Sequence, residues 1–190
     1  RDGRSICVRS PDGPGWRLEI KKYPQLTRKA AWRTHNSWKE WWASSRQYSL
    51  EGAPDAYGGY YTQKEASALV AYAAKRGITI VPEIELPGHS EEVLAVLPQL
   101  ACSGLPYTQG EFCLGNDSSF VFMQDVLTEV MQVFSSSLIH VGGDEVDKKS
   151  WKNCPKCQAA VRVMANNTAA KAVSSAVFLS SPGSVRGFLL

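Results

Sequence analysis

Residues 62–89 read TQKEASALVAYAAKRGITIVPEIELPGH, and this stretch decides the fold class of the chain. Thr62 is suited to cap a helix, and Glu65 three residues later completes a capping box. Gly77 ends the helix after a Lys-Arg pair, and its apolar face consists of Ala66, Leu69, Val70 and Ala73. Residues 78–82 follow as a short, nearly all-apolar run, which predicts a strand buried on both faces.

The same order of elements returns further along the chain. Residues 120–134 predict a second helix, whose apolar positions are Phe122, Val126, Val130 and Met131. Residues 136–141 predict the next strand, which Gly142 and Gly143 close. Alternation of helices and buried strands indicates an α/β protein with a parallel sheet. In such folds the catalytic groups lie at the carboxyl ends of the strands.

The remaining segments carry weaker signals. Residues 1–15 are rich in Gly, Pro and charge and predict a loop, and the alternating residues 16–20 predict a short strand end. Residues 27–57 carry four tryptophans between Gly, Pro and Ser, which is typical of a long surface excursion. Residues 159–190 are rich in Ala, Ser and Val without caps or a steady period, so we expect one domain over residues 1–158 and a tail outside the fold.

The composition narrows the class of protein. Hydrophobic residues make up 44% and charged residues 21% of the 190-residue chain, as in soluble globular proteins. The net charge of +3 is small and the basic residues are scattered, so we expect no nucleic-acid partner. The apolar stretches are far too short to predict a membrane span. Acceptor triplets for N-glycosylation at Asn116 and Asn166 favour a secreted, lysosomal or periplasmic compartment, which the sequence does not determine.

The five cysteines raise the question of a metal. Cys154 and Cys157 have the spacing of a metal knuckle, but a zinc ribbon needs a second pair of that spacing, which the sequence lacks. We therefore expect a local disulfide or free thiols at these positions rather than zinc.

The first segment with the residues for catalysis is PEIELPGH, residues 82–89. Glu83 and Glu85 are two residues apart, so in an extended strand end they point to the same side. The Pro-Gly turn lets His89 fold back toward them, and a carboxylate contact would raise the histidine pKa and fix its tautomer. The alternative is a pair of strand-end carboxylates facing water beside a turn histidine.

The second segment is HVGGDE, residues 140–145. His140 and Gly142 share one side of the predicted strand, and the two glycines allow a sharp turn or the close approach of a ligand. Asp144 and Glu145 then stand at the end of the sheet. The alternative is that Asp144 caps the next helix and Glu145 lies in its first turn.

Carboxylates at the carboxyl edge of a parallel sheet suit the cleavage of a glycosidic bond, where one acid protonates the leaving oxygen. Two chain neighbours cannot readily straddle a sugar as acid and nucleophile, so we expect the second to hold a substrate group. A metal site built from the same acids and histidines is the main rival. The sequence has neither a His-x-x-x-His pattern nor paired aspartates, and no nucleotide-binding glycine loop, so we expect no metal ligand and no cofactor.

Together the motifs resemble glycoside hydrolase family 20, the β-N-acetylhexosaminidases. GWRLEIKKYP at 15–24, GYYT at 59–62, residues 77–89 and HVGGDE at 140–145 occur in the order and approximate spacing of that family. FCLGN at 112–116 and WKNCPKC at 151–157 also resemble its linking segments. The resemblance covers roughly residues 12–158.

The resemblance implies a (β/α)8 TIM barrel, of which residues 1–158 hold about the second to fourth strands. It implies substrate-assisted retaining hydrolysis of terminal N-acetyl-β-hexosamines, in which the substrate's own acetamido oxygen is the nucleophile. Asp144 matches the residue that orients the acetamide, and Glu145 the general acid/base. His89 and Glu85 match the pair that supports the acid/base, and His140 matches a neighbouring hydrogen-bonding histidine. The substrate-binding acids would be Asp12 and Glu83.

An incomplete barrel exposes strand edges and unfilled layers, which predicts poor solubility or dimerisation unless a partner piece completes it. We expect the substrate to be an oligosaccharide or glycoconjugate that carries N-acetylhexosamine. Two alternatives remain: a catalytically incomplete fragment with weak or no sugar binding, and a metal-dependent hydrolase that uses the same residues.

Overall fold

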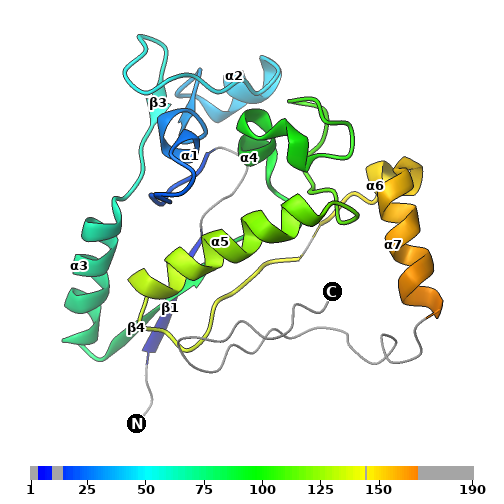
Figure 1. Ribbon diagram of the computed structural model, residues 1–190. Helices are drawn as coiled ribbons and strands as arrows, with labels where there is room; N and C mark the ends of the chain where they lie inside the picture. The colour runs from blue at the N-terminus through cyan, green and yellow to red at the C-terminus, as the bar shows by residue number, and fades with distance from the viewer. Residues whose placement is uncertain (1–3, 10–14, 144, 167–190) are drawn as a thin grey trace.

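The computed structural model describes residues 4–9, 15–143 and 145–166 (Figure 1). All statements on the fold concern these residues. Among them no helix is both long and apolar enough to cross a membrane.

The stretch that decides the fold class forms a helix and a strand as expected. Helix α3 spans Gln63–Ala74, and its capping box is complete, with the Thr62 hydroxyl accepting from the Glu65 backbone and the Glu65 carboxylate accepting from the Thr62 backbone. Gly77 has φ 70° and turns the chain into strand β4, Ile78–Glu83. Only Pro82 and Glu83 of β4 are buried, so the expectation of a strand buried on both faces is wrong over its first four residues. Thr79 is exposed, and Ile78, Ile80 and Val81 are only partly buried.

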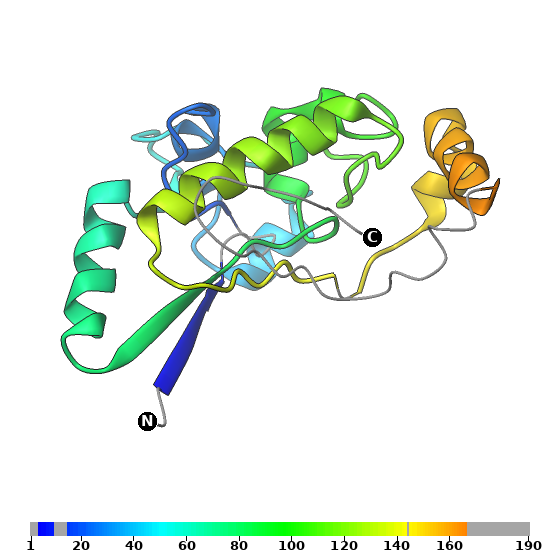
Figure 2. The same cartoon turned by 60° about the horizontal axis from the view of Figure 1, so that its bottom comes forward.

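Strand β1, Arg4–Arg9, contradicts the loop predicted for residues 1–15. It pairs in parallel with β4, from Arg4 opposite Ile78 to Arg9 opposite Glu83. The apolar residues Ile, Cys and Val at positions 6–8 favour an extended chain once an edge is available, and β4 supplies that edge. Figure 2 shows the two strands side by side, with α5 crossing above them. Within the described residues this sheet has two strands and does not close into a barrel.

Helix α5, Asp117–Val133, confirms the second predicted helix and begins three residues earlier, where Asn116 caps it by accepting from the Ser118 backbone. The strand predicted over 136–141 is not formed. A single parallel bridge joins Glu83 to His140, and the backbone hydrogen bonds to residues 82–86 come from residues 140–141 alone (Figure 2). Gly142 and Gly143, with φ 64° and 101°, turn the chain away before a ladder develops.

The other helices and strands surround two units, α3 with β4 and α5 with the segment that follows it. Helix α1 (Gln25–Arg28), strand β2 (Trp32–Arg33), helix α2 (Trp38–Ala43) and strand β3 (Tyr57–Gly58) form the tryptophan-rich excursion, in which β2 and β3 pair antiparallel. Residues 16–20 contribute one bridge, from Leu18 to Tyr61, rather than a strand. Helices α4 (Glu91–Val96), η1 (Pro98–Leu100), α6 (Lys149–Asn153) and α7 (Pro155–Asn166) complete the described chain.

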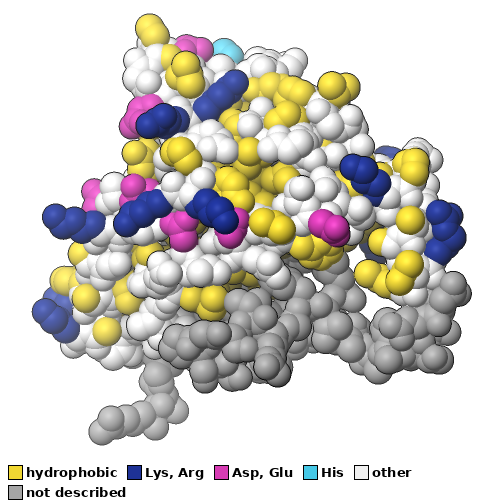
Figure 3. All heavy atoms as spheres, viewed as in Figure 1, with side chains coloured by type: hydrophobic (Ala, Val, Ile, Leu, Met, Phe, Trp, Pro, Cys, Tyr) yellow, Lys and Arg dark blue, Asp and Glu magenta, His cyan; other side chains and the backbone are white. Residues whose placement is uncertain are grey.

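The main core lies between α5, α4 and the segment around Trp16. Its side chains are almost fully buried and include Trp16, Leu26, Val93, Leu94, Phe112, Phe122, Val126, Leu127 and Val130. Figure 3 shows side chains of both charge signs scattered over the face that α5 crosses.

Candidate active site

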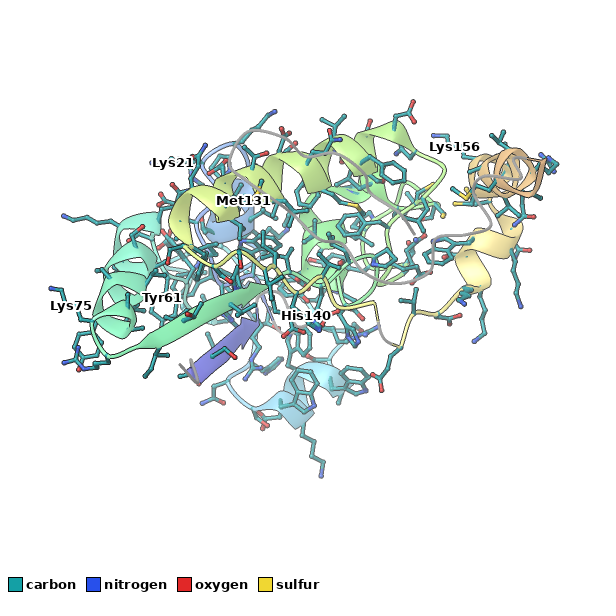
Figure 4. The ribbon with its side chains drawn as sticks, turned by 90° about the horizontal axis from the view of Figure 1, so that it is seen from below. Lys21, Tyr61, Lys75, Met131, His140 and Lys156 are labelled. Carbon is teal, nitrogen blue, oxygen red and sulfur yellow. The ribbon has the colours of Figure 1, made fainter. Side chains whose placement is uncertain are left out.

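The two catalytic candidate segments meet where β4 ends. The His140 amide donates to the Pro82 carbonyl, the Ile84 amide to the His140 carbonyl, and the Leu86 amide to Val141, each at 2.9 Å. These bonds hold residues 140–141 in parallel beside residues 82–86, so the polar groups that follow both segments lie at one edge. Figure 4 shows His140 on the segment beside β4, in the middle of that view.

Glu83 and His140 form the closest carboxylate–imidazole contact of the site. The His140 Nδ1 lies 3.1 Å from the Glu83 Oε1, with Glu83 largely buried and the imidazole 56% exposed. Nδ1 also accepts a hydrogen bond from the Gly142 amide at 3.2 Å, so it lies between the Glu83 carboxylate and the turn that follows His140.

Glu85 is buried against the turn that follows His140. Its side chain is 1% exposed, and a Cβ atom added to Gly142 would collide with its carboxylate. Glu83 therefore faces residue 140 and Glu85 faces residue 142 of the same segment, as the two-residue spacing predicts. Two features require glycine at position 142. Its φ of 64° disfavours any residue with a side chain, and the Glu85 carboxylate occupies the space that a Cβ atom would fill.

His89 and Glu145 approach each other from the two segments. The His89 Nε2 and the Glu145 Oε2 are 3.7 Å apart, which is too long for a hydrogen bond. Nε2 is buried and has no hydrogen-bond partner among the described residues, whereas the Glu145 side chain is 79% exposed. Both residues have a positive φ, 47° and 53°, and non-glycine residues in that conformation cluster at functional sites. The predicted contact between His89 and Glu85 stays a prediction.

A cavity of about 400 Å³ opens beside this pair. It lies between the turn that holds His89, residues 108–111, and residues 145–150. That volume is in the range of small-molecule sites, about 300–1,000 Å³.

Sequence reasoning missed Glu111, a carboxylate that lines this cavity. It is 6% exposed, accepts from the Ser150 hydroxyl, and accepts from the Gly110 amide at 3.1 Å. Burial raises its pKa, although both hydrogen bonds favour the charged form. A single glutamate in a polar loop has no local pattern that marks it.

Two predicted site residues, Asp144 and Asp12, lie outside the described residues. For them the structure gives no geometry. Cys102, Cys113, Cys154 and Cys157 are free, so of the two expectations for Cys154 and Cys157 the structure has free thiols and not the disulfide.

An α/β edge with carboxylate–imidazole contacts beside a sugar-sized cavity fits a hydrolase, and comparison with known proteins defines which one. Residues 10–180 match the catalytic domain of glycosyl hydrolase family 20. The chain belongs to this family.

Its relatives carry consistent names. The chain is 41% identical over 155 residues to a beta-hexosaminidase of Porphyromonas gingivalis, and 41% identical over 157 residues to a beta-hexosaminidase of Vibrio furnissii. The matches cover 77% and 78% of this chain but 18% and 24% of those relatives, so the chain spans less than a quarter of either protein.

Solved structures agree with these relatives. A beta-N-acetylhexosaminidase from Bacteroides fragilis superposes with a TM-score of 0.67 at 36% identity, over 88% of this chain and 30% of that one. A family 20 exo beta-N-acetylglucosaminidase from Vibrio harveyi, in complex with N-acetylglucosamine, gives a TM-score of 0.70 at 31% identity, over 85% and 26%.

Proposed function

We propose that the protein to which this chain belongs hydrolyses terminal non-reducing N-acetyl-β-hexosamine residues with retention of configuration, and that this chain supplies the acid/base. The observation that carries the proposal is the meeting of His89 and Glu145 at one cavity, in a chain of family 20. The substrates are oligosaccharides or glycoconjugates with such a terminal sugar. The complete catalytic domain would be a (β/α)8 barrel, with residues 1–158 as part of it.

In the proposed reaction the substrate's acetamido oxygen attacks the anomeric carbon while the bond to the leaving oxygen breaks. Glu145 donates its proton to that oxygen, and Asp144 orients the acetamide and balances its developing charge. Glu145 then takes a proton from the water that opens the cyclic intermediate. This scheme needs no second carboxylate on the opposite face of the sugar, unlike the two-carboxylate mechanism of most glycosidases.

The neighbouring residues have positioning roles in this proposal. His89 approaches Glu145 from the turn after β4, and the Glu85 carboxylate lies against the Gly142 backbone. The Glu83–His140 contact holds the two segments together, and Glu83 and Asp12 are the acids proposed to bind sugar hydroxyls. Residues 159–190 are proposed as a tail, although the family match extends to residue 180.

The exposure of Glu145 motivates the alternative that this chain alone is inactive. Its side chain is 79% exposed, and the described sheet does not close. A general acid works best where water is excluded, so further segments would have to cover it.

Hydrolysis of N-acetyl-β-glucosaminides by the purified chain tests both statements. Glu145→Gln is expected to lower turnover of an alkyl glycoside about 100-fold or more, and turnover of a nitrophenyl glycoside far less, because a good leaving group needs little acid assistance. Glu51 is an exposed glutamate that does not line the cavity, so Glu51→Gln is the matched control and should leave both rates unchanged.

Equal losses on both glycosides would contradict the acid role of Glu145. A folded chain without activity, whose Glu145→Gln change abolishes turnover only in the longer protein, would support the fragment alternative.

A further inference from the structure

Four cysteines converge at the opposite end of α6 from the candidate active site. The sulfur atoms of Cys102, Cys113, Cys154 and Cys157 all lie within 4.8 Å of one another. The Sγ of Cys157 is 3.6 Å from those of Cys102 and Cys113, and the Sγ atoms of Cys113 and Cys154 are 3.7 Å apart. Three of the four side chains are buried, and Cys102 is partly buried.

The three shortest sulfur–sulfur distances match those of one metal-centred tetrahedron. With zinc–sulfur bonds of about 2.3 Å, the sulfurs of a tetrahedral site are about 3.8 Å apart. A disulfide would bring two of them to about 2.0 Å. A cluster of several irons would need the thiolates further apart than around a single ion, because each sulfur then binds a different iron.

The surrounding backbone is arranged for this convergence. The Cys113 amide donates to the Leu100 carbonyl at 2.8 Å, which brings Cys113 beside the turn that carries Cys102. A Cβ on Gly115 would collide with the Lys156 carbonyl group and the Cys157 nitrogen, so this glycine allows the 113–115 turn to lie directly on the knuckle. Figure 4 shows Lys156 at that end of the molecule.

Backbone amides also point at the sulfurs. The Cys157 amide donates a hydrogen bond to the Cys154 sulfur, and the Gly115 amide donates one to the Cys113 sulfur. Hydrogen bonds from backbone amides stabilise a thiolate, which is the form of cysteine that binds metal.

We infer that Cys102, Cys113, Cys154 and Cys157 bind a single Zn²⁺ as a closed, structural tetrathiolate site. Four soft thiolate ligands at tetrahedral spacing select zinc, and four protein ligands leave no open position for catalysis. On binding, the thiols release their protons and each sulfur forms one bond to the ion. The sequence analysis considered only Cys154 and Cys157, because Cys102 and Cys113 do not have knuckle spacing.

The site fastens the start of α7 to the loop that lines the candidate active site. Two further bonds act in parallel, from the Trp151 indole to the Phe112 carbonyl at 2.8 Å and from the Ser150 hydroxyl to Glu111. Glu145 stands a few residues before this anchor in the chain. The inference is independent of the proposed catalytic role of Glu145.

The test measures zinc content and thiol reactivity of the full chain. Cys7 lies in β1 and is not a member of the group, so Cys7→Ser is both the matched control and the working background, in which the only thiols are the four ligands. We expect one zinc per chain by elemental analysis in the wild type and in Cys7→Ser. Cys113→Ser and Cys154→Ser should each weaken zinc binding at least tenfold in competition with a chelator.

A second measurement does not depend on those variants folding. In Cys7→Ser, native alkylation by iodoacetamide should modify no thiol with zinc bound and all four after chelation, by intact mass. Cobalt in place of zinc should give the charge-transfer intensity of four thiolates. Alkylation unaffected by zinc, two disulfides in the isolated chain, iron instead of zinc, or cobalt bands from fewer thiolates would each overturn the inference.

Discussion

The side of the molecule under α5 and the side formed by α3, β4 and β1 are built from similar residues but packed very differently. The inward residues of α5, Phe122, Met123, Val126, Leu127 and Val130, are at most 4% exposed. On the other side Ile6, Leu69 and Tyr72 are between 45% and 58% exposed. The first region holds most of the main core, whereas α3 buries only the small side chains of Ala66, Val70 and Ala73, at 5–8% exposed.

An apolar cavity marks the second region. It has a volume of about 470 Å³ and is lined by Leu18, Tyr61, Leu69, Ile80 and Phe134, among others. The comparison shows that α3 and β4 form largely through local features such as the capping box. Burial of large apolar side chains, which contributes most to stability, occurs mainly under α5. The site lies at the boundary, where β4 leaves the open side and meets the segment that follows α5.

The largest expected effect on stability is found by replacing a leucine with alanine in each of the two regions. Leu127→Ala in α5 should lower the free energy of unfolding by about 2–5 kcal/mol, because it leaves a cavity in a closed core. Leu69→Ala in α3, with the side chain already 45% exposed, should cost about 1 kcal/mol or less. Urea unfolding of both variants measures the difference, and equal costs would remove the distinction between the two regions.

A smaller effect is expected at the boundary. Gly142→Ala combines a positive φ with a collision against Glu85, and should cost about 1–3 kcal/mol more than an unstrained surface change. Gly77→Ala on the open side is the control, because its φ of 70° is similar and no atom lies near the added Cβ. Thermal unfolding of the two variants separates collision from backbone strain. A Gly142→Ala chain no less stable than Gly77→Ala would show that the Glu85 carboxylate moves aside freely.

The smallest expected effect is the pH dependence of stability contributed by Glu111. Burial raises its pKa in the folded chain, so the folded state prefers the protonated acid. Its contribution is fully present below the unfolded pKa and is lost as the pH rises through the folded pKa. Glu111→Gln should therefore flatten the fall in stability as the pH rises above the ordinary glutamate range. Unfolding curves at several pH values test this, and an unchanged slope would mean that the charged form is fully compensated by Ser150 and Gly110.

The sequence predicted those elements that short-range chemistry determines. Thr62, Glu65 and Gly77 specify the ends of α3 by local hydrogen bonds and backbone conformation, and the stripe of α5 follows the helical period. Strand β1 was missed because its six residues become a strand only by pairing with β4, about seventy residues away. The strand at 136–141 was predicted for the opposite reason, since an apolar run does not reveal whether two glycines will end its pairing early.

The residues of the candidate site likewise divide into those that the sequence predicted and those that it did not. The spacing of Glu83 and Glu85 and the HVGGDE motif identified candidate residues, because they follow predicted strands directly. Glu111 and the cysteine group could not be predicted, since Cys102 and Cys113 lie in a loop whose path depends on the packing of α4 and η1 against α5. Single residues that are far apart in the sequence and meet only in the folded chain produce no periodic pattern by which a sequence could reveal them.

The segment between Val141 and Trp151 is tied at both ends, by the Leu86 amide at one and by the Phe112 carbonyl at the other. A tethered loop has far fewer conformations than a free one, and the cost of ordering it is met largely on folding rather than on binding. A ligand that contacts Glu145 would meet a loop already restricted to a small part of its conformational space. Lengthening the chain between Asp147 and Lys149 by a few glycines would then weaken binding by entropy alone, with every side chain of the site unchanged.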